Sequence, residues 1–351
     1  MESGKNMKQP KLAFNEANKT LSKDVDSAVI DFIAETGIAF RVIGTNSFRK
    51  LMGIANKNIT LKDPRTYSRL AESQAKQVQE DIKAILKAVK SEWTGLAFTT
   101  DMLTSRAGDA FLSMTIHFIC KGWKLYRFVP YVKPFSDKHT GYNISQNLSQ
   151  ILNELGLSPE CVEITAVNDN GSNIKLAIQN ISGMKEHLCD IHTLQLSIRD
   201  AFKEVDGMDT VLKKCRDLAS WTHISSTASN QLHMACKWQN IAYKKLKSMG
   251  ETRWSCQFET MESVLHLKDA IKHLADEHDE WSSRSLDRSG WKLLEGCVGI
   301  LKEFRTTVKI WEAEKVPTTH RAIERLYHNM IILDSYIRER GNCNYGVSFA
   351  R

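Results

Sequence analysis

The sequence predicts an α/β protein in which a mixed β-sheet lies between a helical N-terminal segment and an all-α unit. Two observations predict this class. Apolar residues recur at helical spacing up to about residue 90, and the period then shortens to two between residues 93 and 132, as in strands. From residue 205 to 337 every periodic segment is helical again, and this part holds six of the eight tryptophans.

Length and composition bound the class of protein. The chain has 351 residues, enough for about two domains with a substantial core. Apolar residues make up 42% and charged residues 25%, which is typical of folded proteins and excludes a disordered or collagenous chain. Lys and Arg number 48 against 41 Asp and Glu, a net charge of +7 that permits a polyanionic partner without requiring one.

Redox state and compartment follow from simple patterns. The eight cysteines lie far apart and form no Cys-x-x-Cys pair, so a disulfide framework is not expected. The N-terminus carries no apolar leader, and no uninterrupted apolar run reaches membrane-spanning length. We therefore expect neither secretion nor a membrane partner, which leaves the cytosol or the nucleus.

Changes in pattern along the chain predict five units. The polar, Lys- and Asn-rich beginning is typical of a flexible lead-in, and the last residues carry no periodic pattern. The predicted units are a lead-in at 1–25, a helical N-terminal segment at 26–90, a core at 91–204, a helical domain at 205–340 and an irregular tail at 341–351.

The core begins with three β-rich runs and then alternates helices with strands. We predict strands at 93–101, 110–119 and 123–132, a helix at 143–155, a strand at 161–167, a helix from 172, a short strand at 187–192 and a helix at 193–202. The order β-β-β-α-β-α-β-α is that of an RNase H-like core, a mixed sheet whose carboxylates gather where strand ends meet.

Two aspartates occupy such strand ends. Asp101 ends the first predicted strand and Asp169 ends the fourth, and these strands are neighbours in an RNase H-like sheet. Phosphodiester cleavage and strand transfer use two divalent ions held by carboxylates. On spacing alone, the alternative that both are ordinary strand-end or capping residues stays open. Asp109, Asp190 and Asp200 are further carboxylates near the sheet.

Two other short motifs carry chemically useful side chains. Cys189 and His192 could form half of a zinc site, but no second half is evident, and a structural role is favoured over that site or a Cys/His nucleophile. Arg253 and Trp254 follow a Lys-rich stretch, residues 244–247, for which we predict a helix. This pair could contact a phosphate and stack on a base, or it could be a core Trp beside a surface Arg.

A set of short segments occurs in a fixed order along the chain. They are Phe98–Ser105, Phe128–Pro130 with His139–Gly141, Val167–Asn173, Cys189–Leu196, Thr252–Trp254 and the Trp- and Leu-rich stretch Trp291–Thr319. In this combination the chain resembles the hAT superfamily of cut-and-paste DNA transposases and the host proteins derived from them, including zinc finger BED domain-containing proteins, over about residues 28–335. The resemblance implies an RNase H-like catalytic core interrupted by an all-α insertion domain.

The resemblance also assigns roles to residues. It implies that Asp101 and Asp169 are metal ligands and the first two members of a catalytic Asp-Asp-Glu triad, with Mg²⁺ (or Mn²⁺) as the cofactor if the site is active. Cys189 and His192 match a structural motif of the family, and Trp254, with Arg253 beside it, matches a DNA-binding step. DNA is the implied partner and the nucleus the implied location.

The chain departs from the family in two places. No BED-type zinc finger pattern precedes Asp101, and the family's third carboxylate and its dimerisation region are expected beyond Arg351. We therefore expect a truncated transposase core that binds DNA, is inactive alone, and depends on a protein partner or on a dimer through that missing region. Whether the chain is an enzyme stays open, because the triad is expected to be incomplete.

Two alternatives remain on the sequence. The first is a domesticated, transposase-derived nuclear protein that serves interaction or regulation without chemistry. The second, less favoured, is an autonomous RNase H-type nuclease whose acidic set is complete within Asp101, Asp109, Asp169 and Asp190.

Overall fold

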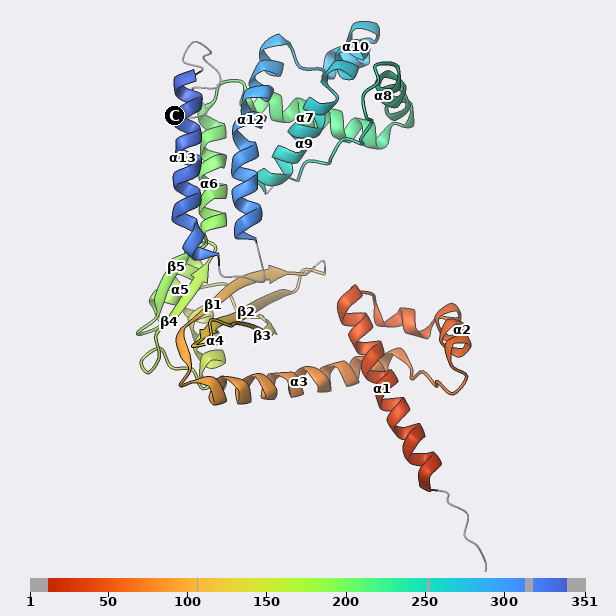
Figure 1. Ribbon diagram of the computed structural model, residues 1–351, viewed down its shortest axis with the longest axis vertical. Helices are drawn as coiled ribbons and strands as arrows, with labels where there is room; N and C mark the ends of the chain where they lie inside the picture. Colours follow the sequence, from red (N-terminus) through yellow and green to blue (C-terminus); the bar gives the residue numbers. More distant parts are fainter. Residues whose placement is uncertain (1–11, 106, 251–252, 313–317, 340–351) are drawn as a thin grey trace, which may run out of the picture.

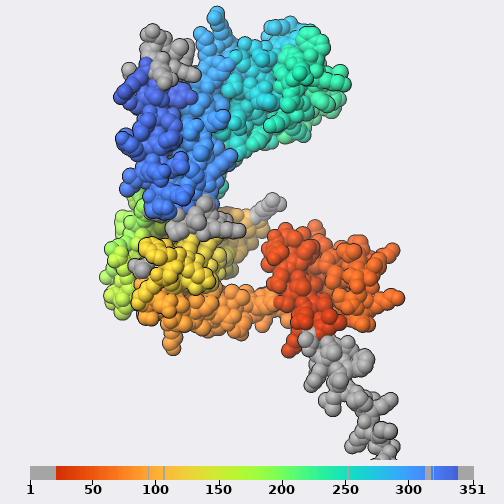
Figure 2. All heavy atoms as spheres, in the orientation of Figure 1, coloured from red at the N-terminus to blue at the C-terminus, as the bar shows by residue number. Residues whose placement is uncertain are grey.

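The computed structural model describes residues 12–105, 107–250, 253–312 and 318–339. In these ranges the chain forms a mixed sheet with helices before and after it (Figure 1). The C-terminal helices stand above the sheet, and helix α3 runs below it toward α1 and α2 (Figure 1). In the space-filling view, the N-terminal helices form a lobe beside the sheet (Figure 2).

The N-terminal lobe is a small helical unit with its own core. Its elements are α1 (Leu12–Thr36), the 3₁₀-helix η1 (Phe40–Gly44), α2 (Asn46–Ala55) and α3 (Pro64–Val89). Val29, Ile43 and Tyr67 are among its buried residues. The Asp63 side chain accepts hydrogen bonds from the first turn of α3, and Pro64 occupies that turn, so both residues define where the helix begins.

Helix α1 corrects the predicted N-terminal boundary. It begins at Leu12, inside the stretch 1–25 that the sequence predicts to be a flexible lead-in. The Lys, Glu, Ala and Leu residues of this stretch are good helix formers, so a polar composition is compatible with extending the apolar helix that follows. Residues 1–11 lie outside the described part of the chain.

The sheet has five strands in the order β3-β2-β1-β4-β5. They are β1 (Trp93–Thr104), β2 (Ala110–Cys120), β3 (Leu125–Pro134), β4 (Ile164–Asn168) and β5 (Lys185–Leu188). The pairs β1–β2 and β2–β3 are antiparallel, whereas β1–β4 and β4–β5 are parallel. The mixed sheet and the order β-β-β-α-β-α-β-α are as predicted.

One face of the sheet packs against helices to form the second core. It is covered by α4 (Gly141–Glu154) and α5 (Ser172–Gln179), and Ile82 and Leu86 of α3 join the same core. A Cβ atom at Gly141 would come within 2.8 Å of the Leu176 side chain, so only glycine permits this approach of α4 to α5.

In its described residues the C-terminal part consists of helices joined by irregular connections, and it contains the third core. Its α-helices are α6 (Asp190–Glu204), α7 (Met208–Ile224), α8 (Ser226–Trp238), α9 (Trp254–His266), α10 (Lys268–Glu277), α11 (Asp279–Arg284), α12 (Arg288–Trp311) and α13 (Ala322–Glu339). Trp254, Trp281, Trp291 and Trp311 are buried, whereas Trp238 is 75% exposed. Among the described residues no helix has both the length and the apolarity to span a bilayer.

Several predicted elements differ from the structure. The strands predicted at 123–132 and 161–167 begin later, at Leu125 and Ile164, so Trp123 lies in the turn before β3. The strand predicted through residue 192 ends at Leu188, and α6 begins at Asp190, whose carboxylate lies in the positively polarised first turn of the helix. The Lys-rich stretch is not helical, because carbonyls of this segment are bonded to histidine rings: Leu246 O to His223 Nε2 at 2.6 Å and Ala242 O to His266 at 2.8 Å. The tail predicted at 341–351 lies outside the described residues.

Candidate functional site

The two predicted metal-binding aspartates lie side by side at one edge of the sheet. In the parallel pair β1–β4, Leu96 is opposite Ile164 and Thr99 is opposite Val167. Asp101 and Asp169 each come two residues after the last of these pairs. They therefore hold equivalent positions on neighbouring strands, and their side chains emerge on the same face of the sheet.

That face carries a groove. Successive side chains of a strand alternate between faces, so Asp101 lies on the face of Ala97 and Thr99, opposite the buried Phe98. Ala97 and Thr99 line a groove of about 650 Å³, which the end of α12 closes with Trp311. The aspartate pair thus stands on the face of the sheet that carries the groove.

A tight turn fixes Asp169. Its Oδ1 accepts a hydrogen bond from the Gly171 backbone N–H at 3.2 Å, and Asn170 occupies the left-handed region with φ of 64°. The buried Asn168 accepts from the Asn170 N–H at 3.0 Å through Oδ1 and donates to Glu186 Oε1 at 2.9 Å through Nδ2. These bonds tie the turn to both β4 and β5.

The electrostatics place four charged or ionisable groups in one neighbourhood. Partial desolvation by the surrounding chain raises the pKa of Asp101, although its side chain is still accessible to solvent, and the negative charge of Asp169 raises that pKa further. The positive fields of Arg253 and His192 act on it in the opposite direction. The site is therefore a pair of mutually repelling carboxylates beside two cationic or potentially cationic side chains.

Cys189 and His192 reach this neighbourhood from the beginning of α6. The Cys189 N–H donates to Asn168 O at 2.8 Å, and the Cys189 carbonyl accepts from Thr193 Oγ1 at 3.0 Å. Its backbone thus joins β4 to the first turn of α6, and the structural role of this motif stays a prediction. His192 lies near the Asp101 carboxyl, whose pKa its charge lowers.

Arg253 and Trp254 differ in their exposure to solvent. Arg253 precedes α9 and is exposed, whereas the Trp254 side chain is only 2% exposed and packs in the helical core. Within the fold described here, the Trp254 ring packs against protein, so the core interpretation that the sequence left open is favoured for this residue. Thr252 lies outside the described residues.

Gln195 is a positioning residue that the sequence did not single out. Its Oε1 accepts a hydrogen bond from the Trp254 backbone N–H at 3.0 Å, which ties the beginning of α9 to α6. Its position inside the segment Cys189–Leu196 was the available signal. His117 and Arg127, which line the groove, were also missed, and burial lowers the pKa of His117 with a smaller contribution from the charge of Arg127.

The other candidate carboxylates have local partners of their own. Asp109 lies in the turn after β1 and accepts from Ser105 Oγ at 3.3 Å through Oδ2. Asp190 lies 3.5 Å from His187, and Asp200 lies 2.8 Å from Lys203. The structure therefore brings Asp101 and Asp169 together, whereas Asp109, Asp190 and Asp200 each contact other residues.

The residues present fit a divalent cation only in part. Two carboxylate groups that repel each other are a donor pair that a divalent cation would stabilise. However, within the described ranges no group of three or more His, Cys, Asp or Glu side chains could hold a metal ion. The pair is thus compatible with one weakly held ion and does not by itself make a complete Asp-Asp-Glu set.

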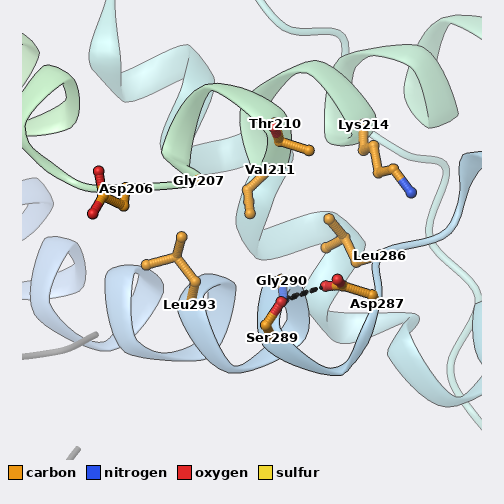
Figure 3. Close-up of a pocket in the computed structure, with 10 residues that line it drawn as sticks. All are labelled: Asp206, Gly207, Thr210, Val211, Lys214, Leu286, Asp287, Ser289, Gly290 and Leu293. Atoms are coloured by element: carbon orange, nitrogen blue, oxygen red, sulfur yellow. Dashed lines mark hydrogen bonds between the residues drawn. The ribbon is translucent and has the colours of Figure 1, made fainter. Parts of the chain in front are cut away.

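A second hollow lies at the other end of the helical domain. It has a volume of about 370 Å³ and lies where the first turns of α7 and α12 meet (Figure 3). There Asp287 Oδ1 accepts from Ser289 Oγ at 2.8 Å and from the Gly290 N–H at 2.7 Å, so its carboxylate caps α12. Helix α12 has 24 residues, which puts this hollow about 36 Å from the Trp311 end and the groove.

Comparison with known proteins supports the class of protein that the fold suggests. The model of the ZBED1 RNase-like helical domain matches residues 188–299, the segment from the end of β5 into α12. The hobo transposase of Drosophila melanogaster is 26% identical over 264 residues, which cover 73% of this chain and 38% of that protein.

Two further relatives are similar over most of the chain. The putative transcriptional regulator tpeD of Talaromyces stipitatus is 21% identical over 329 residues, covering 83% of this chain and 38% of that protein. Human zinc finger BED domain-containing protein 4 is 20% identical over 342 residues, covering 91% of this chain and 28% of that protein. The chain spans less than two fifths of each of these relatives. These similarities support the resemblance to transposase-derived proteins of the hAT and ZBED group.

Proposed function

We propose that the chain binds DNA at the edge of an RNase H-like sheet, where Asp101, Asp169 and Arg253 meet. The observation that carries this proposal is the equivalent placement of the two aspartates on neighbouring parallel strands, with the exposed Arg253 close enough to influence the pKa of Asp101. An arginine beside a carboxylate pair can contact a backbone phosphate, and the same pair can approach that phosphate when a cation lies between them.

The proposed cofactor is Mg²⁺ or Mn²⁺, held by Asp101 and Asp169. When bound, such an ion would neutralise the two carboxylates and polarise a phosphate oxygen of the DNA. Arg253 would add a cation on the same side, and the Asn168–Gly171 turn would keep the Asp169 carboxylate in place. The two aspartates alone provide too few carboxylates for a pair of ions, so we propose binding without cleavage by this chain alone.

A second candidate function is regulation without chemistry. Two observations favour it: a third carboxylate does not join the aspartate pair within the described residues, and one relative is named a putative transcriptional regulator. Both proposals place the protein in the nucleus. A protein partner, or a dimer through a C-terminal region, stays a prediction of the sequence.

The experiment combines binding and cleavage. Fluorescence anisotropy with a labelled 20-base-pair duplex measures affinity at several salt concentrations, and plasmid nicking with Mg²⁺ or Mn²⁺ measures chemistry. We expect Arg253→Gln to weaken binding. Because one phosphate contact is lost, the slope of log affinity against log salt concentration should become less steep by about one. The matched control is Arg65→Gln, an exposed arginine at the beginning of α3 in the N-terminal lobe.

The outcomes separate the candidates. Binding that Arg253→Gln weakens, without nicking by the parent, supports the proposed function. Nicking by the parent that both Asp101→Asn and Asp169→Asn abolish would show a complete acidic site and contradict the proposal of binding alone. Absence of DNA binding at physiological salt would favour a regulator that acts through protein contacts.

A further inference from the structure

Trp123 lies at the tip of the turn between β2 and β3 in an unusual backbone conformation. Its side chain is 88% exposed, and its φ is 58°, in the left-handed region that a bulky residue rarely occupies. Gly122 comes directly before it, yet the positive φ falls on the tryptophan and not on the glycine. The turn therefore holds an indole in solvent at the expense of backbone strain, a feature that concentrates at functional sites.

The backbone around Trp123 is anchored on both sides. The Trp123 N–H donates to Cys120 O at 2.8 Å, and the Cys120 N–H donates to Lys124 O at 3.2 Å. The Lys124 ammonium lies 4.8 Å from the centre of the Tyr126 ring. An indole on an anchored turn can serve as a binding platform that loses little conformational freedom when a ligand binds.

The surroundings of this turn are basic. The Lys121 N–H donates to Glu92 O at 3.1 Å, which joins the turn to the connection between α3 and β1. Four exposed lysines lie on these two segments, and one exposed acidic residue, Glu92, lies among them. The lysines are Lys87 and Lys90 from the end of α3, and Lys121 and Lys124 from the turn.

We propose that Trp123 and these four lysines form a second nucleic-acid contact, which we name the Trp123 surface. Its ligand is a DNA or RNA strand with unpaired bases, since a free indole face stacks on a base and lysines contact the phosphates on either side. The site lies about 26 Å from Asp101 along β1, at the opposite end of that strand. The inference extends the proposed DNA binding and rests on it.

The variant Trp123→Gly tests this role without threatening the fold. Glycine adopts a positive φ without strain, so the variant should melt about 2–4 °C higher than the parent. Its affinity for a labelled 20-nucleotide oligo(dT) strand should fall about tenfold, whereas its affinity for a 20-base-pair duplex should change less. The matched control is Trp238→Ala, which removes an indole that is 75% exposed on α8.

Three results decide the matter. If Trp123→Gly binds the single strand more weakly than the parent while Trp238→Ala keeps the parent's affinity, the inference is supported. A smaller dependence of affinity on salt in Lys90→Gln/Lys121→Gln supports the role of the lysines. Unchanged single-strand affinity in Trp123→Gly overturns the inference, while weakening by Arg253→Gln in the same series would leave the proposed function intact. Equal losses in Trp123→Gly and Trp238→Ala would also overturn it.

Discussion

Asp101 and Asp169 hold equivalent positions on two neighbouring parallel strands, and the charge of Asp169 raises the pKa of Asp101. The pairing of Thr99 with Val167 two residues earlier fixes this relationship through the backbone ladder. The fold thus maintains electrostatic repulsion at one edge of the sheet, with Arg253 and His192 close by. Such a site is suited to a ligand that brings positive charge between the two carboxylates.

The first prediction concerns the pKa of Asp101. Replacing Asp169 by Asn removes one negative neighbour, so the pKa of Asp101 should fall, yet stay above its usual value because desolvation, the larger cause, remains. Carboxyl ¹³C chemical shifts measured against pH would follow the change. Asp109→Asn, on the turn after β1, is the control and should leave the titration of Asp101 as it is. An unchanged pKa in Asp169→Asn would show that the two carboxylates do not interact.

The second prediction concerns stability and pH. A carboxyl whose pKa is higher in the folded than in the unfolded chain makes the folded state less stable once pH rises through the window between these two values. Asp101→Asn should therefore raise the melting temperature at pH 7, and this advantage should shrink as pH falls below the folded pKa. Thermal melts of parent and variant at pH 3.5 to 8 would test it. A variant that melts lower than the parent at pH 7 contradicts this account.

The third prediction concerns Gln195. Replacement by Ala removes the acceptor for the Trp254 N–H and should cost about 1 kcal/mol of unfolding free energy. Because the bond positions Arg253, the pKa of Asp101 should rise further when that positive neighbour is less well held. Gln195→Glu keeps an acceptor oxygen and should retain most of the stability. Equal destabilisation in both variants would show that the hydrogen bond to Trp254 is not what Gln195 contributes.

The fourth prediction compares the loss of stability on replacing Trp254, which is buried, with that on replacing Trp238, which is exposed. Trp254→Ala should cost about 3–5 kcal/mol, because it leaves a cavity in the core. Trp238→Ala should cost far less, since that side chain is mostly exposed. Urea denaturation of both variants gives the comparison. A small loss in Trp254→Ala would contradict the placement of this indole in the core.

The sheet could be predicted well from the sequence, because the patterns that indicate its strands lie within short segments of the chain. Period-two runs defined β1 to β3, and the alternation of strands with helices predicted the parallel part of the sheet. The same reasoning placed Asp101 and Asp169 at one edge, because equivalent positions on parallel strands follow from element order. The predicted boundary between β5 and α6 was wrong, because a short strand and the first turn of a helix give the same apolar signal over a few residues.

Other features depend on contacts between distant segments. The bond from Trp254 to Gln195 joins residues that are 59 positions apart. Residues 244–247 have the composition of a helix, yet their segment is held by carbonyl contacts with the rings of His223 and His266. Helix propensity is a weak preference that such tertiary contacts override. The left-handed φ of Trp123 was equally hidden, because Gly122 beside it is the residue that a turn pattern would select.

The central claim is that Asp101 and Asp169 face bound DNA and hold a divalent cation there. The most direct measurement is the affinity for a 20-base-pair duplex, in EDTA and in Mg²⁺ at constant ionic strength, of the parent and of Asp101→Asn/Asp169→Asn. We predict that the double variant binds more tightly than the parent in EDTA, and that Mg²⁺ reduces or abolishes this difference by strengthening binding of the parent alone. The same affinity for parent and variant in both conditions would contradict the claim.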